Sequence, residues 1–261
     1  MKIAVIGAGS MGSALAEGLL KGNFFKPKDI VIANPHQEKL EKFALQGVQT
    51  TTNNCIAVEG AQLIAIVVKP WLVEQVICEI KPVLNYQHQI IINIAAGISS
   101  DILFSWLNKD GSTPPLFQVI PNIAIAYRAS MSFIVPCKAD EKQTVLVKSL
   151  FDDLGQSLIT DEAHLAAGTT LASCGIAYAM RYVRAATEGG VELGFKADTA
   201  TAIVLQTLQG AVSLLQGTDM HPEAAIDRVT TPGGLTIKGL NAMEKAGFTN
   251  AVIQGLKAGT K

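Results

Sequence analysis

A glycine-rich stretch near the start of the chain has the residue types and spacing that hold a phosphate group. Gly7, Gly9 and Gly12 form the pattern G-x-G-x-x-G after an apolar run (residues 2–6) and at the start of a helical pattern. In such a motif the glycines allow a tight turn, approach of the backbone to a pyrophosphate, and close helix–strand packing. A structural turn can look the same, but the position after the first strand favours a dinucleotide. The residues expected to contact it are Gly7, Ala8, Gly9, Ser10 and Met11.

The end of the second predicted strand indicates which dinucleotide is bound. An acidic residue there would hold the ribose of NAD, but the sequence IVIANPHQ has Asn34 in that place. A carboxylate would repel the 2′-phosphate of NADP and an amide would not, so Asn34 favours NADPH and leaves NADH possible. His36 and Lys39 are the nearby side chains that could meet the phosphate.

Two further loops follow predicted strands, at the sheet edge where ligands gather in open α/β folds. They cover residues 67–70 and 93–97. The residues expected to contact the cofactor there are Val67, Val68, Lys69, Pro70, Ala95 and Ala96. For Lys69 the position of an ordinary solvated loop lysine fits the sequence equally well.

Near the C-terminus, the sequence RVTTPGGLTIKGLNAMEKAGF (residues 228–248) places two glycines just before a predicted helix. Gly233 and Gly234 free the backbone for a tight turn and leave N–H groups open at the positive end of the helix dipole. These amides could receive a carboxylate or a phosphate. The local pattern alone also fits an ordinary loop that ends in a capped helix.

The elements that carry these loops alternate between strand and helix in the first part of the chain. Short runs rich in Ile and Val, bounded by Gly, Pro and Asn, indicate strands buried on both faces. The alternation predicts parallel pairing in a doubly wound α/β sheet. The predicted strands cover residues 2–6, 30–33, 47–50, 62–68, 89–95, 116–120, 131–136 and 156–160, with helical stretches such as 11–21, 37–46, 71–80 and 141–154.

After about Thr160 the strand patterns stop. A long helical pattern over residues 161–195 precedes helices near 196–216, 222–228 and 236–245. We therefore predict a dinucleotide-binding domain over residues 1–160 and a helical domain over residues 161–261. Small residues on one face of the long helix (Ala172, Gly175 and Ala179) allow close packing against another helix, within one chain or between subunits.

The composition limits the classes of partner. The 261 residues are 49% hydrophobic and 16% charged with a net charge of −1, which is typical of a compact protein without attraction for nucleic acid or anionic membranes. The four cysteines are scattered, as expected of reduced thiols, and no metal site is expected. The N-terminus reaches glycines too early for a signal peptide, and the longest aliphatic run, LIAIVV, has the length of a strand. We expect a cytoplasmic protein that acts on a small-molecule substrate.

The order of these motifs resembles the pyrroline-5-carboxylate reductase family. The stretch TTPGGLTIKGLNAMEKAGF is similar to the family signature S-P-G-G-T-T-I, which is followed by a helix and an acidic-x-G-F turn. The agreement covers essentially the whole chain. The other shared motifs are G-A-G-x-M at 7–11, V-K-P at 68–70, A-A-G at 95–97, P-N at 121–122, G-x-A-Y at 175–178, E-G-G-V-x-L-G-F at 188–195, and His221-Pro222.

The resemblance implies the last step of proline biosynthesis. In that reaction a hydride passes from NAD(P)H to the C5=N carbon of 1-pyrroline-5-carboxylate and gives L-proline. The resemblance also implies a Rossmann-like doubly wound sheet, an all-α C-terminal dimerisation domain, and a homodimer or larger homo-oligomer. The substrate site would form where the two domains meet across the dimer.

The same resemblance gives the C-terminal glycines a role. Backbone N–H groups of Gly233, Gly234 and Leu235 would hold the substrate carboxylate at a helix N-terminus. Thr231 and Thr236 would add hydroxyl groups that act as donors or contact the ring nitrogen.

Two further residues take their roles from the resemblance alone. Asp219 matches an acidic residue near the substrate in some relatives, and Asn54 matches an asparagine that meets the cofactor. His221 could serve as the proton donor, but the His-Pro sequence is more typical of the start of a helix.

Three departures from the family pattern surround the expected pocket. The family's S-G-S-G-P is Ala172-Ser173-Cys174-Gly175-Ile176, its paired threonines are Leu235-Thr236, and its Thr-Pro after P-N is Ile123-Ala124. These changes leave open a reductase of another cyclic imine and a non-catalytic NADP-binding protein. A β-hydroxyacid dehydrogenase of similar layout would need a lysine on the long central helix, and LASCGIAYAMRYVRA contains none.

Overall fold

The computed structural model describes residues 1–260, which form two compact units. The first unit comprises Met1–Ser173 and contains every strand of the described chain, and the second begins at Cys174 and is helical. The predicted division after Thr160 lies between the last strand and the helices that complete the first unit.

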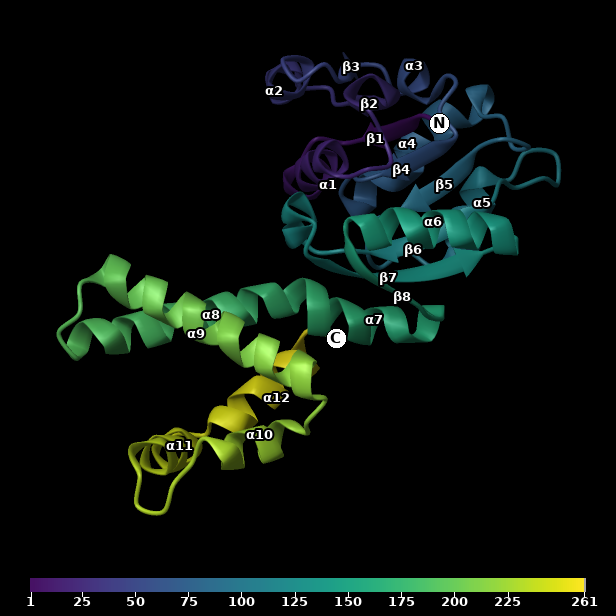
Figure 1. Ribbon diagram of the computed structural model, residues 1–261. Helices are drawn as coiled ribbons and strands as arrows, with labels where there is room; N and C mark the ends of the chain where they lie inside the picture. Colours follow the sequence, from purple (N-terminus) through teal and green to yellow (C-terminus); the bar gives the residue numbers. More distant parts are fainter. Residues whose placement is uncertain (261) are drawn as a thin grey trace. The chain divides into compact units, whose positions relative to one another are not determined.

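An eight-stranded sheet forms the centre of the first unit (Figure 1). The strand order is β3-β2-β1-β4-β5-β6-β7-β8, so the chain reverses its direction across the sheet between β1 and β4. The strands are β1 (Ile3–Ile6), β2 (Ile30–Ala33), β3 (Gln49–Thr51), β4 (Leu63–Ile66), β5 (Ile90–Asn93), β6 (Leu116–Ile120), β7 (Ser130–Cys137) and β8 (Gly155–Ile159). The doubly wound α/β fold predicted from the sequence is confirmed.

One strand pair departs from the predicted parallel arrangement. β7 runs antiparallel to β6, whereas every other neighbouring pair is parallel. The connection between β6 and β7 contains only the short 3₁₀ helix η5 (Ile123–Tyr127). Because a parallel crossover needs a dozen or more residues, usually with a helix, this short connection returns the chain in the opposite direction.

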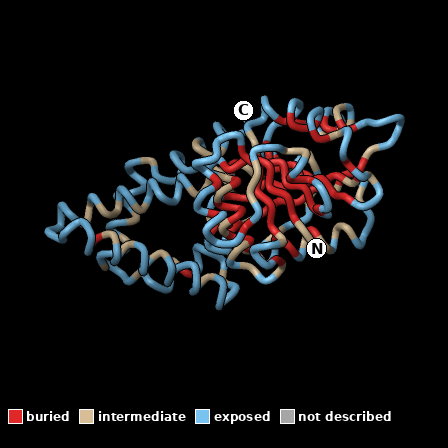
Figure 2. The backbone as a smooth tube through the Cα atoms, turned by 90° about the horizontal axis from the view of Figure 1, so that it is seen from above, coloured by how far each residue is buried: buried red, intermediate tan, exposed pale blue. Residues whose placement is uncertain are grey.

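Helices cover both faces of the sheet and produce two separate apolar layers. On β1, Ile3 and Val5 belong to one layer, and Ala4 and Ile6 to the other, because successive side chains point to opposite faces. Figure 2 shows the buried residues concentrated in the interior of this unit. The helices of this unit are α1 (Ser10–Lys21), α2 (Glu41–Ala44), α3 (Asn54–Val58), α4 (Val73–Ile80), α5 (Ser100–Leu107), α6 (Glu141–Asp153) and α7 (Leu165–Gly168).

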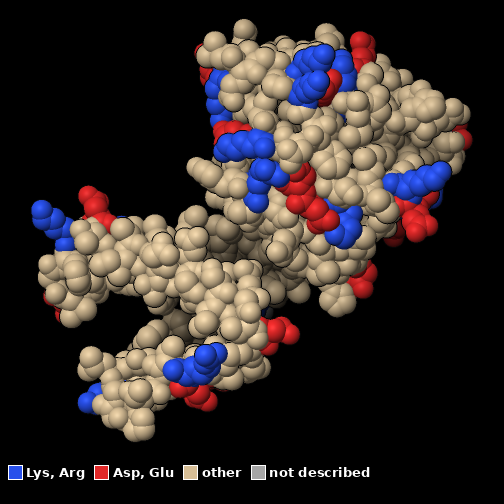
Figure 3. Space-filling model, viewed as in Figure 1, with Lys and Arg blue, Asp and Glu red and all other residues tan. Residues whose placement is uncertain are grey.

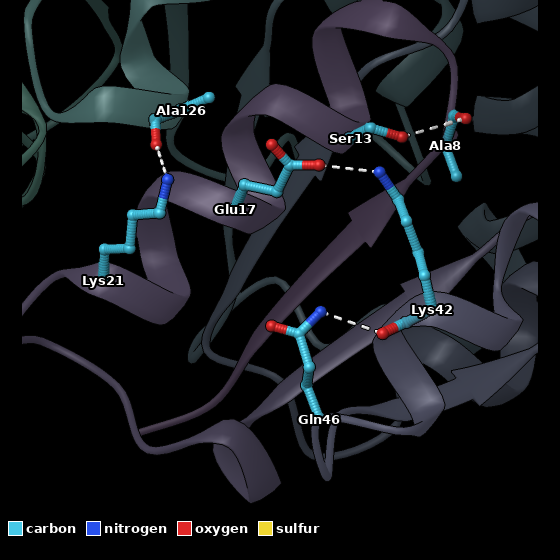
Figure 4. A network of polar contacts seen from close by, with 7 residues as sticks. All are labelled: Ala8, Ser13, Glu17, Lys21, Lys42, Gln46 and Ala126. Carbon is cyan, nitrogen blue, oxygen red and sulfur yellow. Dashed lines mark hydrogen bonds and ion pairs between the residues drawn. The ribbon is translucent and has the colours of Figure 1, made fainter.

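Polar contacts fix helix α1 along its length (Figure 4). Ser13 Oγ donates to the Ala8 carbonyl at 3.3 Å, and Glu17 pairs with Lys42 Nζ at 2.6 Å. At the last turn, Lys21 Nζ donates to the carbonyl of Ala126 in η5 at 2.7 Å. Helix α1 is therefore joined both to the turn that precedes it and to the loop that follows β6.

The second unit contains five helices within the described residues. They are α8 (Gly175–Glu192), α9 (Ala197–Thr218), α10 (Pro222–Arg228), α11 (Leu235–Lys245) and α12 (Phe248–Ala258). Between residues 174 and 260 only Ala200 and Ala225 are buried in a single copy (Figure 2). On the face seen in Figure 3, charged side chains are sparse over these helices, and positive and negative groups are interspersed.

The long helical pattern predicted over residues 161–195 is interrupted. The chain passes through the 3₁₀ helix η6 (Glu162–His164), α7 and a π-helical segment η7 (Thr169–Cys174) before α8 begins. The Asn122 side-chain amide donates to the carbonyl of Ala172 at 3.4 Å. A side chain that takes a carbonyl from the helical ladder is a common cause of such an irregular turn. No helix of the described residues is long and apolar enough to cross a membrane.

Gly18→Ala should test the packing of α1 against η5. Alanine normally stabilises a helix interior relative to glycine, but a Cβ at Gly18 would lie 2.3 Å from the carbonyl oxygen of Ile125. We expect overpacking to lower the free energy of unfolding by about 1–3 kcal/mol, measured by denaturant titration. Glu17→Ala, which removes only a partly exposed ion pair from the same helix, should change the stability little. Stabilisation by Gly18→Ala would show that η5 does not pack closely on α1.

Candidate functional site

The glycine-rich turn places helix α1 directly above the carboxyl edge of the sheet. Gly7 has a φ of +107°, and a Cβ there would lie 2.3 Å from the Val67 carbonyl oxygen. A Cβ on Gly12 would lie 1.9 Å from the Gly7 carbonyl oxygen. Both positions therefore require glycine, for the close approach of the turn to β4 and of the helix to the turn.

Gly9 differs from the other two glycines because it faces open space. It is the N-cap residue of α1, makes no side-chain cap, and a Cβ there would meet nothing within 4 Å. The backbone N–H groups of residues 8–12 have no acceptor among the described residues. Open donors at the positive end of a helix dipole suit a phosphate group.

The Asn34 amide lies at the end of β2, and the side chains of His36, Glu38 and Lys39 follow it at the same edge of the sheet. Asn34 is 7% exposed, and its Oδ1 accepts the backbone N–H of His36 at 2.9 Å. The Asn34 amide nitrogen therefore remains as a donor. His36 Nδ1 lies 3.6 Å from Glu38 Oε1 with both side chains largely exposed, and Lys39 is also exposed. The sequence reasoning missed Glu38, although it stands between the two basic candidates.

The loops after β4 and β5 lie at the edge where β1 ends. The strand register pairs Ile6 with Ile66 and Ile66 with Asn93. Val67 is buried, with its N–H donating to the Ile6 carbonyl, while Val68 is half-buried. Lys69 and Pro70, which begin the 3₁₀ helix η3 (Pro70–Leu72), are exposed.

A buried asparagine fixes the loop after β5, and the sequence reasoning did not select it. Asn93 Nδ2 donates to the Ala95 carbonyl at 2.8 Å, and Asn93 Oδ1 accepts the Ala95 N–H at 3.3 Å. Ala95 is buried, and Ala96 and Gly97 are exposed. An asparagine that ends an apolar strand was the available signal.

Asn54 lies at the first position of α3 and already has a protein partner. Its Nδ2 donates to Glu79 Oε2 at 2.8 Å, which leaves its amide oxygen as the group open to a cofactor. The residue before it, Asn53, caps the helix by accepting the N–H of Ile56.

In the second unit, the residues before α11 form a tight turn with open donors. Gly233 has a φ of +70°, and the Gly234 N–H donates to the Thr231 carbonyl at 2.9 Å, so this one of the predicted donors is already used within the turn. A Cβ on Gly234 would lie 2.4 Å from Thr231 Oγ1, so the threonine hydroxyl packs directly on this glycine. Leu235 and Thr236 form the exposed first turn of α11, and their N–H groups have no acceptor among the described residues.

Asp219 and His221 lie between α9 and α10 rather than in this turn. Asp219 is exposed and ends α9 in the left-handed conformation, with a φ of +50°. His221 caps α10 by accepting the Glu223 N–H through Nδ1 at 3.2 Å, as the His-Pro sequence predicted. A hollow of about 550 Å³ beside Met180, Thr187 and Val191 of α8 contains none of the predicted site residues.

The cysteines show no arrangement for nucleophilic catalysis. All four are free thiols, and burial raises the pKa of Cys137 to about 11. No group of three or more metal-ligating side chains occurs among residues 1–260.

Comparison with known proteins gives consistent matches for both units. A family model described as "Pyrroline-5-carboxylate reductase dimerisation" matches residues 162–261, and one described as "NADP oxidoreductase coenzyme F420-dependent" matches residues 2–97. The chain is 36% identical to pyrroline-5-carboxylate reductase 1 of Dictyostelium discoideum over 97% of its own length, but spans about half (48%) of that protein. It is 35% identical to pyrroline-5-carboxylate reductase 2 of the same organism, with 97% of this chain and 89% of that one covered.

A solved structure has the same fold. The pyrroline carboxylate reductase of Plasmodium falciparum, determined with NADP bound, superposes with a TM-score of 0.90 at 23% identity, covering 100% of this chain and 95% of that one.

Substitution of two neighbouring glycines should separate folding from dinucleotide binding. Gly9→Asp places a carboxylate in open space, so the thermal midpoint should stay within a few degrees while NADPH binding is lost through charge repulsion. Gly12→Ala should instead destabilise the fold by about 1–3 kcal/mol or more, because its Cβ collides with backbone. Thermal unfolding and NADPH fluorescence titration measure the two effects. Normal NADPH binding by Gly9→Asp would contradict the assignment of this turn.

Proposed function

This chain belongs to the pyrroline-5-carboxylate reductase family, and we propose that it reduces 1-pyrroline-5-carboxylate to L-proline with NADPH, the last step of proline biosynthesis. The observation that carries this function is the 35% identity to a named reductase over nearly the whole of both chains. The two glycine turns add physical support, because each presents open backbone donors to an anionic group.

The turn before α1 fits the pyrophosphate of the cofactor. The free space at Gly9 and the unpaired N–H groups of residues 8–12 form a cradle that any larger side chain at Gly9 would fill. The loops at residues 67–70 and 95–96 complete the binding edge in this proposal. When bound, the nicotinamide supplies the hydride for the reduction.

The end of β2 favours NADPH over NADH. Asn34 Oδ1 is used by His36, so the Asn34 amide nitrogen remains as a donor for a phosphate oxygen. His36 and Lys39 flank the same position, while the carboxylate of Glu38 opposes a 2′-phosphate. We therefore expect a preference for NADPH that Glu38 weakens, rather than strict selectivity.

The turn before α11 binds the substrate carboxylate in this proposal. The open N–H groups of Leu235 and Thr236 lie at the positive end of an eleven-residue helix, where a carboxylate is stabilised. The exposed Thr236 hydroxyl donates to the substrate, and Thr231 shapes the turn through its contact with Gly234. We also expect Asp219 to lie near the substrate, as the family resemblance implies.

The chemistry of the substrate limits what the protein must supply. A cyclic imine becomes strongly electrophilic once its nitrogen is protonated, and solvent can provide that proton before binding. Orientation of the imine carbon toward the hydride donor then accounts for most of the rate acceleration. The glycine turns serve this purpose because they hold both anionic groups with fixed backbone donors.

The assembly and cellular location belong to the same proposal. The match to a dimerisation model and the exposed apolar side chains of α8 and α9 support a homodimer. The four free thiols suit the reducing cytoplasm.

Steady-state oxidation of NADPH and then NADH, with 1-pyrroline-5-carboxylate as substrate, tests the reaction and the cofactor together. We expect efficient turnover with higher kcat/KM for NADPH, and a larger NADPH preference in Glu38→Gln, which removes the opposing carboxylate. Tight NADPH binding without turnover of this imine would contradict the proposed substrate. It would direct attention to Leu235, which stands where the family has threonine.

Thr236→Val tests the hydroxyl at the start of α11. A hydrogen bond to a charged group contributes about 1.5–3 kcal/mol, so kcat/KM for the imine should fall about tenfold to a hundredfold. NADPH affinity should not change. Thr249→Val is a matched control, because the Thr249 hydroxyl bonds to Glu244 on the protein itself. Unchanged imine reduction by Thr236→Val would remove this residue from the site.

A further inference from the structure

A carboxylate far away in the sequence holds the first turn of the helix that follows the β5 loop. Glu162 is the first residue of η6, and its Oε1 accepts the Ser100 N–H at 2.9 Å. Its Oε2 accepts the Ser100 hydroxyl at 2.5 Å. The two residues are 62 positions apart, and Ser100 is the first residue of α5.

This contact completes the fixing of the loop after β5. Asn93 holds Ala95 by two hydrogen bonds at the strand end, and Glu162 holds Ser100 at the start of the helix. Only residues 96–99 lie between the two anchors, with Gly97 in the left-handed conformation at a φ of +80°. The exposed backbone of Ala96 and Gly97 is therefore confined from both ends.

The electrostatics favour a charged carboxylate in this position. Partial burial alone would raise the pKa of Glu162, but the hydrogen bonds from the Ser100 hydroxyl and N–H, with a smaller contribution from the Gln118 side chain, outweigh it and lower the pKa below its usual range. The carboxylate also lies at the N-terminus of α5, where the helix dipole stabilises a negative charge.

The segment that carries Glu162 is held to a second loop at the same edge of the sheet. From η6 the chain continues through α7 to the π-helical segment, where the Ala172 carbonyl accepts the side chain of Asn122. Asn122 follows β6 and also accepts the Ala124 N–H at 3.0 Å. Residues 162–172 are thus tied to the loops after β5 and after β6.

We propose that Glu162 is a positioning residue for the reduction, which holds the Ala96–Gly97 backbone in its cofactor-binding conformation through Ser100. This role rests on the proposed function, in which the loop after β5 contacts the dinucleotide. Glu162 acts through Ser100 and does not itself contact the cofactor. Through this contact, residues 162–172, which precede the helical unit, are hydrogen-bonded to the end of that loop.

Hydrogen–deuterium exchange on the free protein and NADPH titration together test the role. In Glu162→Ala and in Ser100→Ala, amide exchange at residues 94–101 should accelerate. The dissociation constant and KM for NADPH should rise about tenfold, with a smaller effect on kcat, because a displaced binding group weakens productive orientation. The double variant should be little worse than either single one, since both remove the same contact.

Two further variants keep the test decisive. Glu162→Gln retains one oxygen that can accept the Ser100 N–H, so it should fold and show an intermediate effect even if Glu162→Ala unfolds. Glu141→Ala removes an exposed glutamate from the first turn of α6 and should match the wild type in both measurements.

Unchanged exchange at residues 94–101, or faster exchange with unchanged NADPH affinity, would overturn the positioning role. Absence of wild-type turnover with the imine would instead contradict the proposed substrate. The exchange and affinity comparisons would still test Glu162 in that case, so the two failures are distinguishable.

Discussion

The close approach of helix α1 to the carboxyl edge of β1 and β4 is the constraint on which the first unit depends. It exists because Gly7 and Gly12 lack side chains that would collide with the backbone at Val67 and Gly7. The approach brings the open N-terminus of α1 to the point where the strand order reverses, which is the binding edge of doubly wound sheets. Toward its C-terminal end, the same helix contacts the loop after β6 through Gly18 and Lys21. The glycine contacts thus position the open N-terminus of α1, and the same helix contacts the loop after β6.

Much of the fold could be predicted from the sequence because its signals are local. Ile- and Val-rich runs of strand length, each followed by a turn and a helical pattern, indicate buried parallel strands without long-range information. The predicted parallel pairing is wrong for β6 and β7, because the direction of β7 depends on its short connection to β6 rather than on the strand's own residues. The interruption at residues 169–174 was also missed, since its side-chain partner, Asn122, lies in a distant loop.

The candidate site shows the same difference between local and long-range signals. The glycine turns at residues 7–12 and 233–234 can be predicted from the sequence, because the glycines and the helical pattern that follows them are adjacent in the chain. Glu162 was not selected, because its partner Ser100 is 62 positions away and neither residue belongs to a motif. Asn93 does not belong to a motif either, although its side chain bonds both backbone groups of Ala95. Sequence patterns therefore indicate candidate ligand-binding surfaces more readily than the groups that hold those surfaces in place.

The small interior of the helical unit has a consequence for how this half of the chain folds. With two alanines as its only buried residues between positions 174 and 260, a single copy gains little from removing apolar surface from water. In the proposed homodimer, association would bury further apolar surface of this unit, so by mass action its denaturation midpoint would depend on protein concentration. Dilution alone, without heat or denaturant, would then lower the stability of this half.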